Sequence, residues 1–430
     1  METNTAEIKR SVEFDDFREN ILHNIEDPAE LEKLYRKNKA VFQRVFNTLY
    51  TDLRHNTIAQ VWNERLNYQQ NEFYPGSRKD LLFVVLASVM AGLIANIPDL
   101  PGMNKEFFFS RNIGFIVFPV LIGYFSWKQK TALRTSVSQL VVILASVCYI
   151  NLLPDHPQSD TLILACIHLP VFLWTVLGYS FVGGKLSDNQ KKIDFLRFNG
   201  DFAVMTAILV LSGILFTGIT FGLFEMIGLH IQEFYAQHIL AWGLATIPVL
   251  STFLVQTNPQ LVNKISPLIA RIFTPVVFVT LFVFLCTIIY TGKNVYHDRN
   301  FLLMFNGLLI AVMAIILFSV SEATKNTGNR INLFFLFGLS LLSIVVNSIA
   351  LSAIAFRLTE FGISPNRLAV SGANLLIFIN LLGVTYQLLR ALQNKADVQK
   401  VENVIARFLP LYGIWAALIT FLLPLIFGFK

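Results

Sequence analysis

The sequence contains few charged residues and few cysteines for its length. Only 14% of the 430 residues are charged, whereas a soluble chain contains about 25%. This low charge excludes an ordinary soluble globular protein, which carries charged side chains over most of its surface. The three cysteines all fall inside apolar stretches, as small core residues do, which argues against disulfides or a cysteine metal site.

The signatures of several enzyme classes are missing as well. The sequence has no P-loop motif, no GxSxG nucleophile elbow, no CxxC pair and no GxGxxG fingerprint. A P-loop ATPase, a serine hydrolase, a thiol redox enzyme and a typical dinucleotide enzyme therefore find no support. We predict no catalytic residue, no metal ion and no cofactor. No basic segment followed by a short apolar stretch opens the chain, so we expect no cleaved secretory signal.

Hydrophobic residues dominate what is present. They make up 54% of the chain, which includes 39 phenylalanines, and the mean hydropathy is +0.57. Runs of about 20 apolar residues cross a bilayer as helices, so we predict an all-α polytopic transmembrane helical bundle over residues 80–430, with about eleven spans. The predicted spans are 80–97, 111–127, 134–153, 161–183, 200–226, 236–255, 268–291, 300–321, 331–357, 366–390 and 408–428.

Residues 1–79 read as a small cytoplasmic unit of two or three amphipathic helices. Asp27 and Pro28 are typical of a helix start, and a second helix is predicted to start at Asn56. The apolar residues follow helical spacing, so they either pack against one another or bind a membrane surface or partner helix. They are Leu31, Leu34, Tyr35, Phe42, Phe46, Ile58, Val61, Trp62 and Leu66.

Charge distribution predicts the orientation and argues against nucleic acid as a partner. Residues 1–79 hold 12 Lys or Arg and 13 Asp or Glu, so the positive excess of the chain resides in the membrane part. With the amino terminus inside, the cytoplasmic connections carry 15 basic residues and the opposite side carries 7. This positive-inside bias predicts that the N-terminal unit lies in the cytoplasm.

The segment 357–370, RLTEFGISPNRLAV, is predicted to form a tight hairpin between two spans. Gly362 is placed to end one helix in the left-handed conformation, and Ser364 and Pro365 are placed to start the next. Such a turn would bring Arg357, Glu360 and Arg367 together, so that both guanidinium groups share the carboxylate. On this basis, replacing Arg367 by alanine is predicted to destabilise the fold.

The residues Phe361, Gly362, Ile363, Ser364, Pro365, Asn366 and Arg367 resemble a known signature, aromatic-Gly-aliphatic-Ser/Thr-x-x-Arg. It occurs in a family of uncharacterised multipass membrane proteins from bacteria. The resemblance implies a bacterial inner-membrane location and no established activity.

Polar residues inside the predicted spans are the candidates for a binding site, because burying them in hydrocarbon is costly without a partner. They either line a polar cavity or join helices by hydrogen bonds. Arg357 and Arg367 would suit an anionic guest at the outer end of such a cavity. The polar candidates are Asn347, Ser371, Asn374, Asn380 and Gln387. Histidine and carboxylate residues on the predicted outer loops lack a metal-ligand motif, so we interpret them as solvated.

Three functions remain open from the sequence. The favoured hypothesis is a transporter or permease-like protein for a small or amphipathic solute. The alternative is a membrane-embedded sensor or scaffold whose residues 1–79 bind a cytoplasmic protein partner, and a third is an enzyme acting on lipid-linked substrates. The bilayer is the expected environment in every case, and the sequence does not determine the oligomeric state.

Overall fold

The computed structural model describes residues 17–37, 39–50, 52–67, 76–156, 158–226, 229–262, 265–291, 299–323, 330–393 and 397–429. The chain divides into two compact units, Met1–Phe73 and Tyr74–Lys430. Each is described separately below. The described residues form helices and connecting turns, with no strand among them.

The first unit is a small helical cluster built from α2 (Pro28–Lys37), α3 (Lys39–Leu49) and α4 (Thr57–Asn67). Asp27 Oδ1 accepts hydrogen bonds from the amides of Ala29 and Glu30, which satisfies the free N–H groups at the start of α2. Asn56 Oδ1 accepts in the same way from Ala59 at the start of α4. Both predicted helix starts are confirmed.

The apolar faces of these helices pack against one another. Phe42 and Phe46 of α3 are fully buried, and Tyr35 and Trp62 lie against Phe42 with ring centroids 5.7 and 5.2 Å away. Val61 departs from the prediction, because it is 62% exposed rather than part of the buried face. Most of the predicted apolar stripe therefore forms a hydrophobic core within the unit.

A surface ion-pair cluster on this unit predicts a pH effect. Glu32 lies 2.8 Å from Arg36 Nε and 2.8 Å from Arg65 Nη2. The hydrogen bond from Arg36 and the positive charge of both arginines hold the pKa of Glu32 below its ordinary value of 4.5. A lowered pKa adds stability above the ordinary pKa, and this contribution is lost as the pH falls through the lowered pKa.

We therefore expect amide protection factors in α2–α4 to fall as the full-length protein is acidified from neutral pH to about pH 3. Glu32→Gln should remove part of that pH dependence, because it cannot ionise. Glu64→Gln is the matched control, since Glu64 is exposed and forms no ion pair with the described residues. Equal pH dependence in the wild type and Glu32→Gln would contradict the assignment. Hydrogen exchange read by mass spectrometry measures both.

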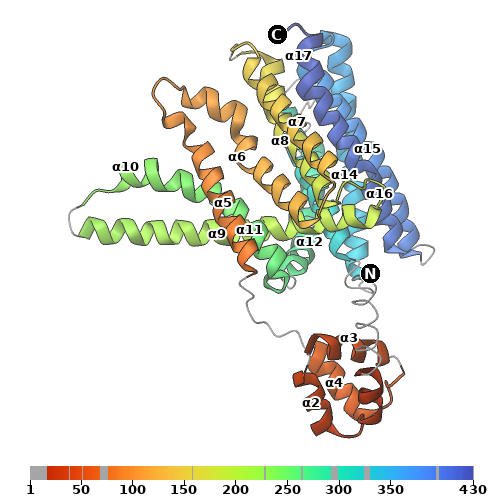
Figure 1. The fold of residues 1–430 in the computed structure, drawn as a ribbon. Coiled ribbons are helices and arrows are strands. Elements are labelled where there is room, and N and C mark those ends of the chain that lie inside the picture. The colour runs from red at the N-terminus through yellow and green to blue at the C-terminus, as the bar shows by residue number, and fades with distance from the viewer. Residues whose placement is uncertain are drawn as a thin grey trace. The chain divides into compact units, whose positions relative to one another are not determined.

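The second unit begins with α5 (Arg78–Ala95), α6 (Lys105–Lys128), α7 (Leu133–Leu152), α8 (Asp160–Phe181) and the long helix α9 (Asn189–Met226). The short α10 (Gln232–Tyr235) leads through a π-helical turn into α11 (Ala241–Thr257), which lies beside α9 (Figure 1). The chain continues with α12 (Ile265–Thr291), α13 (Arg299–Ala323), α14 (Arg330–Phe361), α15 (Pro365–Leu392) and α16 (Val398–Ala417). A second π-helical turn, Leu418–Leu422, joins α16 to α17 (Leu423–Ile426).

These helices make the chain an integral membrane protein. Within the described residues, nine helices are long and apolar enough to cross a bilayer. Two further apolar segments, α11 (Ala241–Thr257) and Phe305–Ser321 within α13, coincide with the remaining predicted runs. The predicted all-α polytopic bundle is confirmed, and the number of spans is approximate.

Two large hydrophobic clusters hold the membrane unit together. One cluster is formed mainly by α12–α16 with the start of α9, and includes Phe305, Leu339 and Val384. The other is formed by α6, α7 and α8 with parts of α9 and α11, and includes Phe125 and Leu173. Trp174 of α8 packs against both clusters. The contact of α8 with α16 is therefore part of the junction between two groups of helices, and the candidate site lies there.

Candidate functional site

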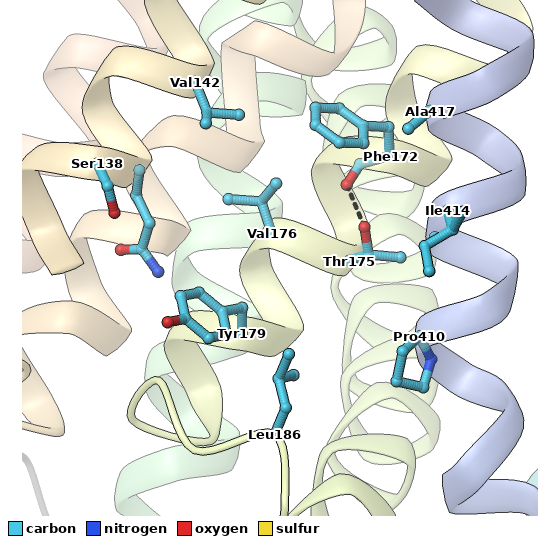
Figure 2. Close-up of a pocket in the computed structure, with 12 residues that line it drawn as sticks. Ser138, Val142, Phe172, Thr175, Val176, Tyr179, Leu186, Pro410, Ile414 and Ala417 are labelled. Atoms are coloured by element: carbon cyan, nitrogen blue, oxygen red, sulfur yellow. Dashed lines mark hydrogen bonds between the residues drawn. The ribbon is translucent and has the colours of Figure 1, made fainter.

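A cavity of about 390 Å³ lies between α7, α8 and α16, and is referred to below as the groove. Figure 2 shows Val142 of α7, Val176 and Phe172 of α8, and Ile414 of α16 around it. Most of its wall is apolar, and its volume is within the range of small-molecule sites in proteins. The complete lining is Ser138, Gln139, Val142, Phe172, Thr175, Val176, Tyr179, Leu186, Pro410, Gly413, Ile414 and Ala417.

Local sequence features of α16 shape this groove. Gly413 lies so close to α8 that a Cβ atom there would be 2.7 Å from Thr175 Cγ2. One turn earlier, Pro410 has no N–H to donate to the preceding turn of α16. The hydroxyl of Thr175 donates to its own helix, to the carbonyl of Phe172 at 2.7 Å (Figure 2). The two helices thus touch at Gly413, while the groove opens between them and α7.

Two polar groups on the groove wall have unused hydrogen-bonding capacity. Gln139 of α7 is 3% exposed; its Oε1 accepts from Ser126 Oγ at 3.0 Å, whereas its buried Nε2 has no partner among the described residues. The hydroxyl of Tyr179 also makes no hydrogen bond within the described part of the chain. An unmet donor in an apolar wall favours a ligand with an oxygen acceptor, because leaving the donor unpaired is costly.

A smaller recess of about 50 Å³ adjoins the groove at the carboxyl end of α8. The two cavities share Thr175, Tyr179, Leu186 and Pro410. The recess is otherwise lined by Trp174, Gly178, Val182, Lys192, Phe195 and Leu409. Lys192, in the first turn of α9, is the charged residue of this lining, and it is only 8% exposed.

Beside the recess, a buried polar cluster joins α9 to α13 and α16. Arg197 donates to Asp194 at 2.9 Å, to Glu402 of α16 at 2.7 Å and to the carbonyl of Ser321 at 2.7 Å. Asn189 donates to Asn403 of α16 at 3.2 Å. Glu402 is 3% exposed, so its charge is neutralised by Arg197 rather than by water. These contacts fix the start of α9, and therefore Lys192, against α16.

The predicted hairpin forms, with one correction. Gly362 has φ +73°, Ser364 Oγ accepts from the Arg367 amide, and Pro365 is the first residue of α15. The expected shared ion pair is wrong, because Glu360 is exposed and forms no ion pair within the described residues. Arg367 Nη1 instead donates to the carbonyls of Phe361 and Gly362, at 2.8 and 2.6 Å. A carbonyl at a helix end needs a donor, and the guanidinium reaches it over a short distance.

Replacing glycine by alanine is predicted to change the stability in opposite directions at Gly362, in the hairpin, and at Gly307, inside α13. Gly362→Ala should destabilise the protein by about 1 kcal/mol, because alanine is disfavoured in the left-handed conformation. Gly307→Ala should instead be neutral or stabilising by up to about 1 kcal/mol, because Gly307 lies inside α13 with no atom within 4 Å of an added Cβ. Thermal unfolding of both variants in one detergent measures the difference. Equal shifts at both positions would contradict the assigned role of Gly362.

The polar residues predicted to line a cavity are mainly joined to other helices. Asn347 of α14 is fully buried and donates to the backbone carbonyl of Asn374 in α15 at 3.0 Å. Asn374 donates to Asn306 Oδ1 of α13 at 2.7 Å, and Asn380 donates to the Tyr412 hydroxyl of α16 at 2.9 Å. These contacts match the alternative in which polar residues bind helices together. The side-chain oxygens Oδ1 of Asn347 and Asn380 have no partner among the described residues.

The remaining predicted residues are not gathered into one site. Ser371 donates to Leu368 in its own helix, and Gln387 has a buried Oε1 that accepts no hydrogen bond from the described residues. Arg357 is half-buried and makes no ion pair within the described part of the chain. No group of three His, Cys, Asp or Glu residues is arranged to hold a metal ion in the described ranges. His297 and Asp298, two of the outer-loop residues, lie outside those ranges.

The residues that line the groove and the recess were not predicted from the sequence. Lys192 is one of several basic residues in a predicted cytoplasmic connection, and nothing in the local pattern marks it as buried. Gln139 lies in an otherwise typical span. A weak signal existed in Pro410 and Gly413, since proline and glycine in a transmembrane helix often accompany irregular packing or close approach.

Comparison of the sequence and the structure with protein-family models, curated proteins and solved structures gave no match. The resemblance of residues 361–367 to the bacterial multipass family stays a prediction.

Proposed function

We propose that this integral membrane protein is a permease-like transporter of an amphipathic solute, and that the groove between α7, α8 and α16 binds the solute during transfer. The observation that carries the proposal is the position of the groove, at the junction of the two packed groups of helices. Transporters commonly bind their substrate where two such groups meet and move against each other. The apolar wall suits a hydrocarbon chain, and Gln139 and Tyr179 suit a polar group.

The surroundings of the groove support movement at this junction. Pro170 in α8 and Pro410 in α16 each remove one backbone hydrogen bond from a helix that borders it. The π-helical turn Leu418–Leu422 follows directly after the groove residues of α16, and such turns are frequent at functional sites. We further propose the bacterial inner membrane as the location, with residues 1–79 in the cytoplasm, from the positive-inside bias.

Reconstitution tests the transport function directly. The purified protein is placed in phosphatidylcholine liposomes with a fluorescent single-chain amphiphile, and dithionite is added outside to bleach the outer leaflet. Transport is expected to expose the protected inner-leaflet fluorophores. Val176→Trp, which fills the groove, should slow exposure at least about tenfold. Val171→Trp is the matched control, because Val171 lies on the same helix and is 41% exposed.

Two results would count against transport. One is a protected fraction that stays the same with and without protein across amphiphiles of different head groups. The other is equal transport by Val176→Trp and Val171→Trp, which would remove the groove from the pathway.

As a second function, we propose a membrane-embedded sensor or scaffold, because the first unit has its own hydrophobic core. Deleting residues 1–73 should then abolish recovery of a specific cytoplasmic partner while the membrane unit still purifies as a folded protein. Unchanged partner recovery would contradict this alternative.

A further inference from the structure

Lys192 carries a positive charge that makes no ion pair within the described residues, and the negative charge of Asp188 attracts it only from beyond contact distance. Its side chain is buried, and its Nζ donates to the neutral amide oxygen of Asn189 at 3.2 Å. Within the described residues, no carboxylate oxygen lies within 4.0 Å of it: Asp188 accepts from the Lys191 amide at the start of α9, and Asp194 and Glu402 pair with Arg197. A buried charge without a carboxylate in contact is costly, so such a group favours a ligand of opposite charge.

The surroundings of Lys192 distinguish it from an ordinary interfacial lysine. Its neighbours in the recess are mainly apolar, including Trp174, Val182 and Phe195. The recess adjoins the groove, and the two share the lining residues Tyr179 and Leu186. The charge is thus placed beside a cavity that is otherwise suited to hydrocarbon.

The groove continues away from Lys192 along α8. The lining residues Phe172 and Tyr179 are seven positions apart, which corresponds to about 10 Å of helix. Gln139, whose Nε2 has no partner among the described residues, and Tyr179 both line this wall. An apolar slot of this length, with donors on its wall and a cation in the adjoining recess, matches a molecule with one hydrocarbon chain and a negatively charged head.

We infer that the groove and its recess select single-chain amphiphiles with an anionic, oxygen-rich head, and that Lys192 binds that head. This inference rests on the proposed transport function, because it names the class of solute that the groove would carry. It concerns only which molecule binds, and binding is measured separately from transport. The head chemistry is shared by a free carboxylate amphiphile and by an anionic phospholipid that inserts one chain, and these two sources are separated below. Lysine suits either head, because its ammonium group acts as a compact point charge.

Quenching of Trp174 reports occupancy, because this residue lines the recess. The protein is placed in phosphatidylcholine nanodiscs and titrated with stearate carrying a doxyl label near its carboxylate. The difference between the wild type and Trp174→Phe gives the quenching at this site. We expect saturable quenching by the acid and little by its methyl ester. Lys192→Gln should weaken binding of the acid about tenfold, the effect of losing one charged hydrogen bond.

Lys185→Gln is the matched control, because it removes the same charge from an exposed position in the same connection. It should bind the acid as the wild type does. Brominated phosphatidylglycerol forms the second arm: quenching that depends on Lys192 with this lipid, but not with the acid, supports the same recognition and identifies the source as a bilayer lipid.

Equal quenching by the acid and its methyl ester in the wild type would reject the free acid as the source, and it would overturn the inference if quenching by the brominated lipid were also independent of Lys192. Equal binding of the acid by the wild type and a folded Lys192→Gln would also overturn it, unless the lipid arm shows the dependence. Binding through Lys192 without transfer in the liposome assay would uphold the head-group site and reject the transport function. Transfer without any preference for the anionic head would uphold the transport function and reject the head-group site.

Discussion

Replacing Arg111 by methionine is expected to prevent the membrane unit from folding stably. Arg111 is on α6, its side chain is 1% exposed, and its guanidinium lies at the carboxyl end of α7. Nη1 donates to the carbonyls of Ile150 and Leu153 at 2.6 and 3.1 Å, and Nη2 lies 3.2 Å from Asp155 Oδ1. Methionine fills similar volume but donates nothing.

The expected loss is large because several groups lose their partner together. The last carbonyls of a helix have no acceptor role within the helix, so they depend on donors from outside. Leaving a buried acceptor without its donor costs about 1–3 kcal/mol, and the carbonyls of Ile150 and Leu153 both lose theirs. The ring of Phe107, 4.4 Å from the guanidinium carbon, also loses its cation–π contact. We therefore expect little folded protein from Arg111→Met.

Thermal unfolding of detergent-purified protein, followed by tryptophan fluorescence and gel filtration, measures the effect. Arg134→Met is the control, because Arg134 is exposed in the first turn of α7 and lies on a helix that takes part in the same contact. Arg111→Lys should be intermediate, since one ammonium group replaces a planar fork that reaches several oxygens. A melting temperature for Arg111→Met equal to that of Arg134→Met would reject this role.

Replacing Gly372 by leucine is expected to force α15 and α16 apart. A Cβ atom at Gly372 would lie 2.0 Å from Cζ2 of Trp415, far inside van der Waals contact. The indole is held in place, because its Nε1 donates to the carbonyl of Ala369 at 3.3 Å and its ring packs against Ala369, Ile419 and Leu423. The ring cannot rotate away without losing both contacts.

Overpacking of this kind costs about 1–3 kcal/mol when the surroundings adjust, and more when they are fixed. We expect Gly372→Leu to lower the stability by about 3 kcal/mol, or to leave the protein unfolded. Gly123→Leu, on α6, is the matched control: no atom lies within 4 Å of a Cβ at that position, so leucine there should be tolerated. Trp415→Phe should partly rescue Gly372→Leu, because the smaller ring vacates the contested space. Absence of rescue, or equal melting temperatures for the two leucine variants, would contradict this packing.

Both contacts illustrate why the candidate site could not be predicted from the chain alone. Lys192, Lys191 and Lys185 have the same side chain within one connection, and only the packing of α9 on α16 makes the first of them buried. Gln139 and Pro410 are 271 positions apart yet line one cavity. Three of the predicted polar residues, Asn347, Asn374 and Asn380, are buried, and their partners on α15, α13 and α16 show that they hold helices together.

The hairpin at Gly362 contains both a feature that the sequence predicts and one that it does not. Its backbone followed from the sequence, because the left-handed glycine, the serine cap and the first-turn proline each act on their own neighbours. The partner of Arg367 did not follow, because a long side chain chooses between a carboxylate and two carbonyls only once the helix ends are placed.

The sequence by itself determined the lipid-embedded, all-helical architecture, the approximate positions of the spans and the starts of α2 and α4. These depend on the length of apolar runs and on hydrogen bonds between residues close in the chain. The tertiary structure alone decided where the groove lies, which lysine is buried beside it and which carbonyls the arginines cap. Those features depend on the distances between helices that are far apart in the sequence. Side-chain volumes and close contacts fix these distances only when the whole bundle packs.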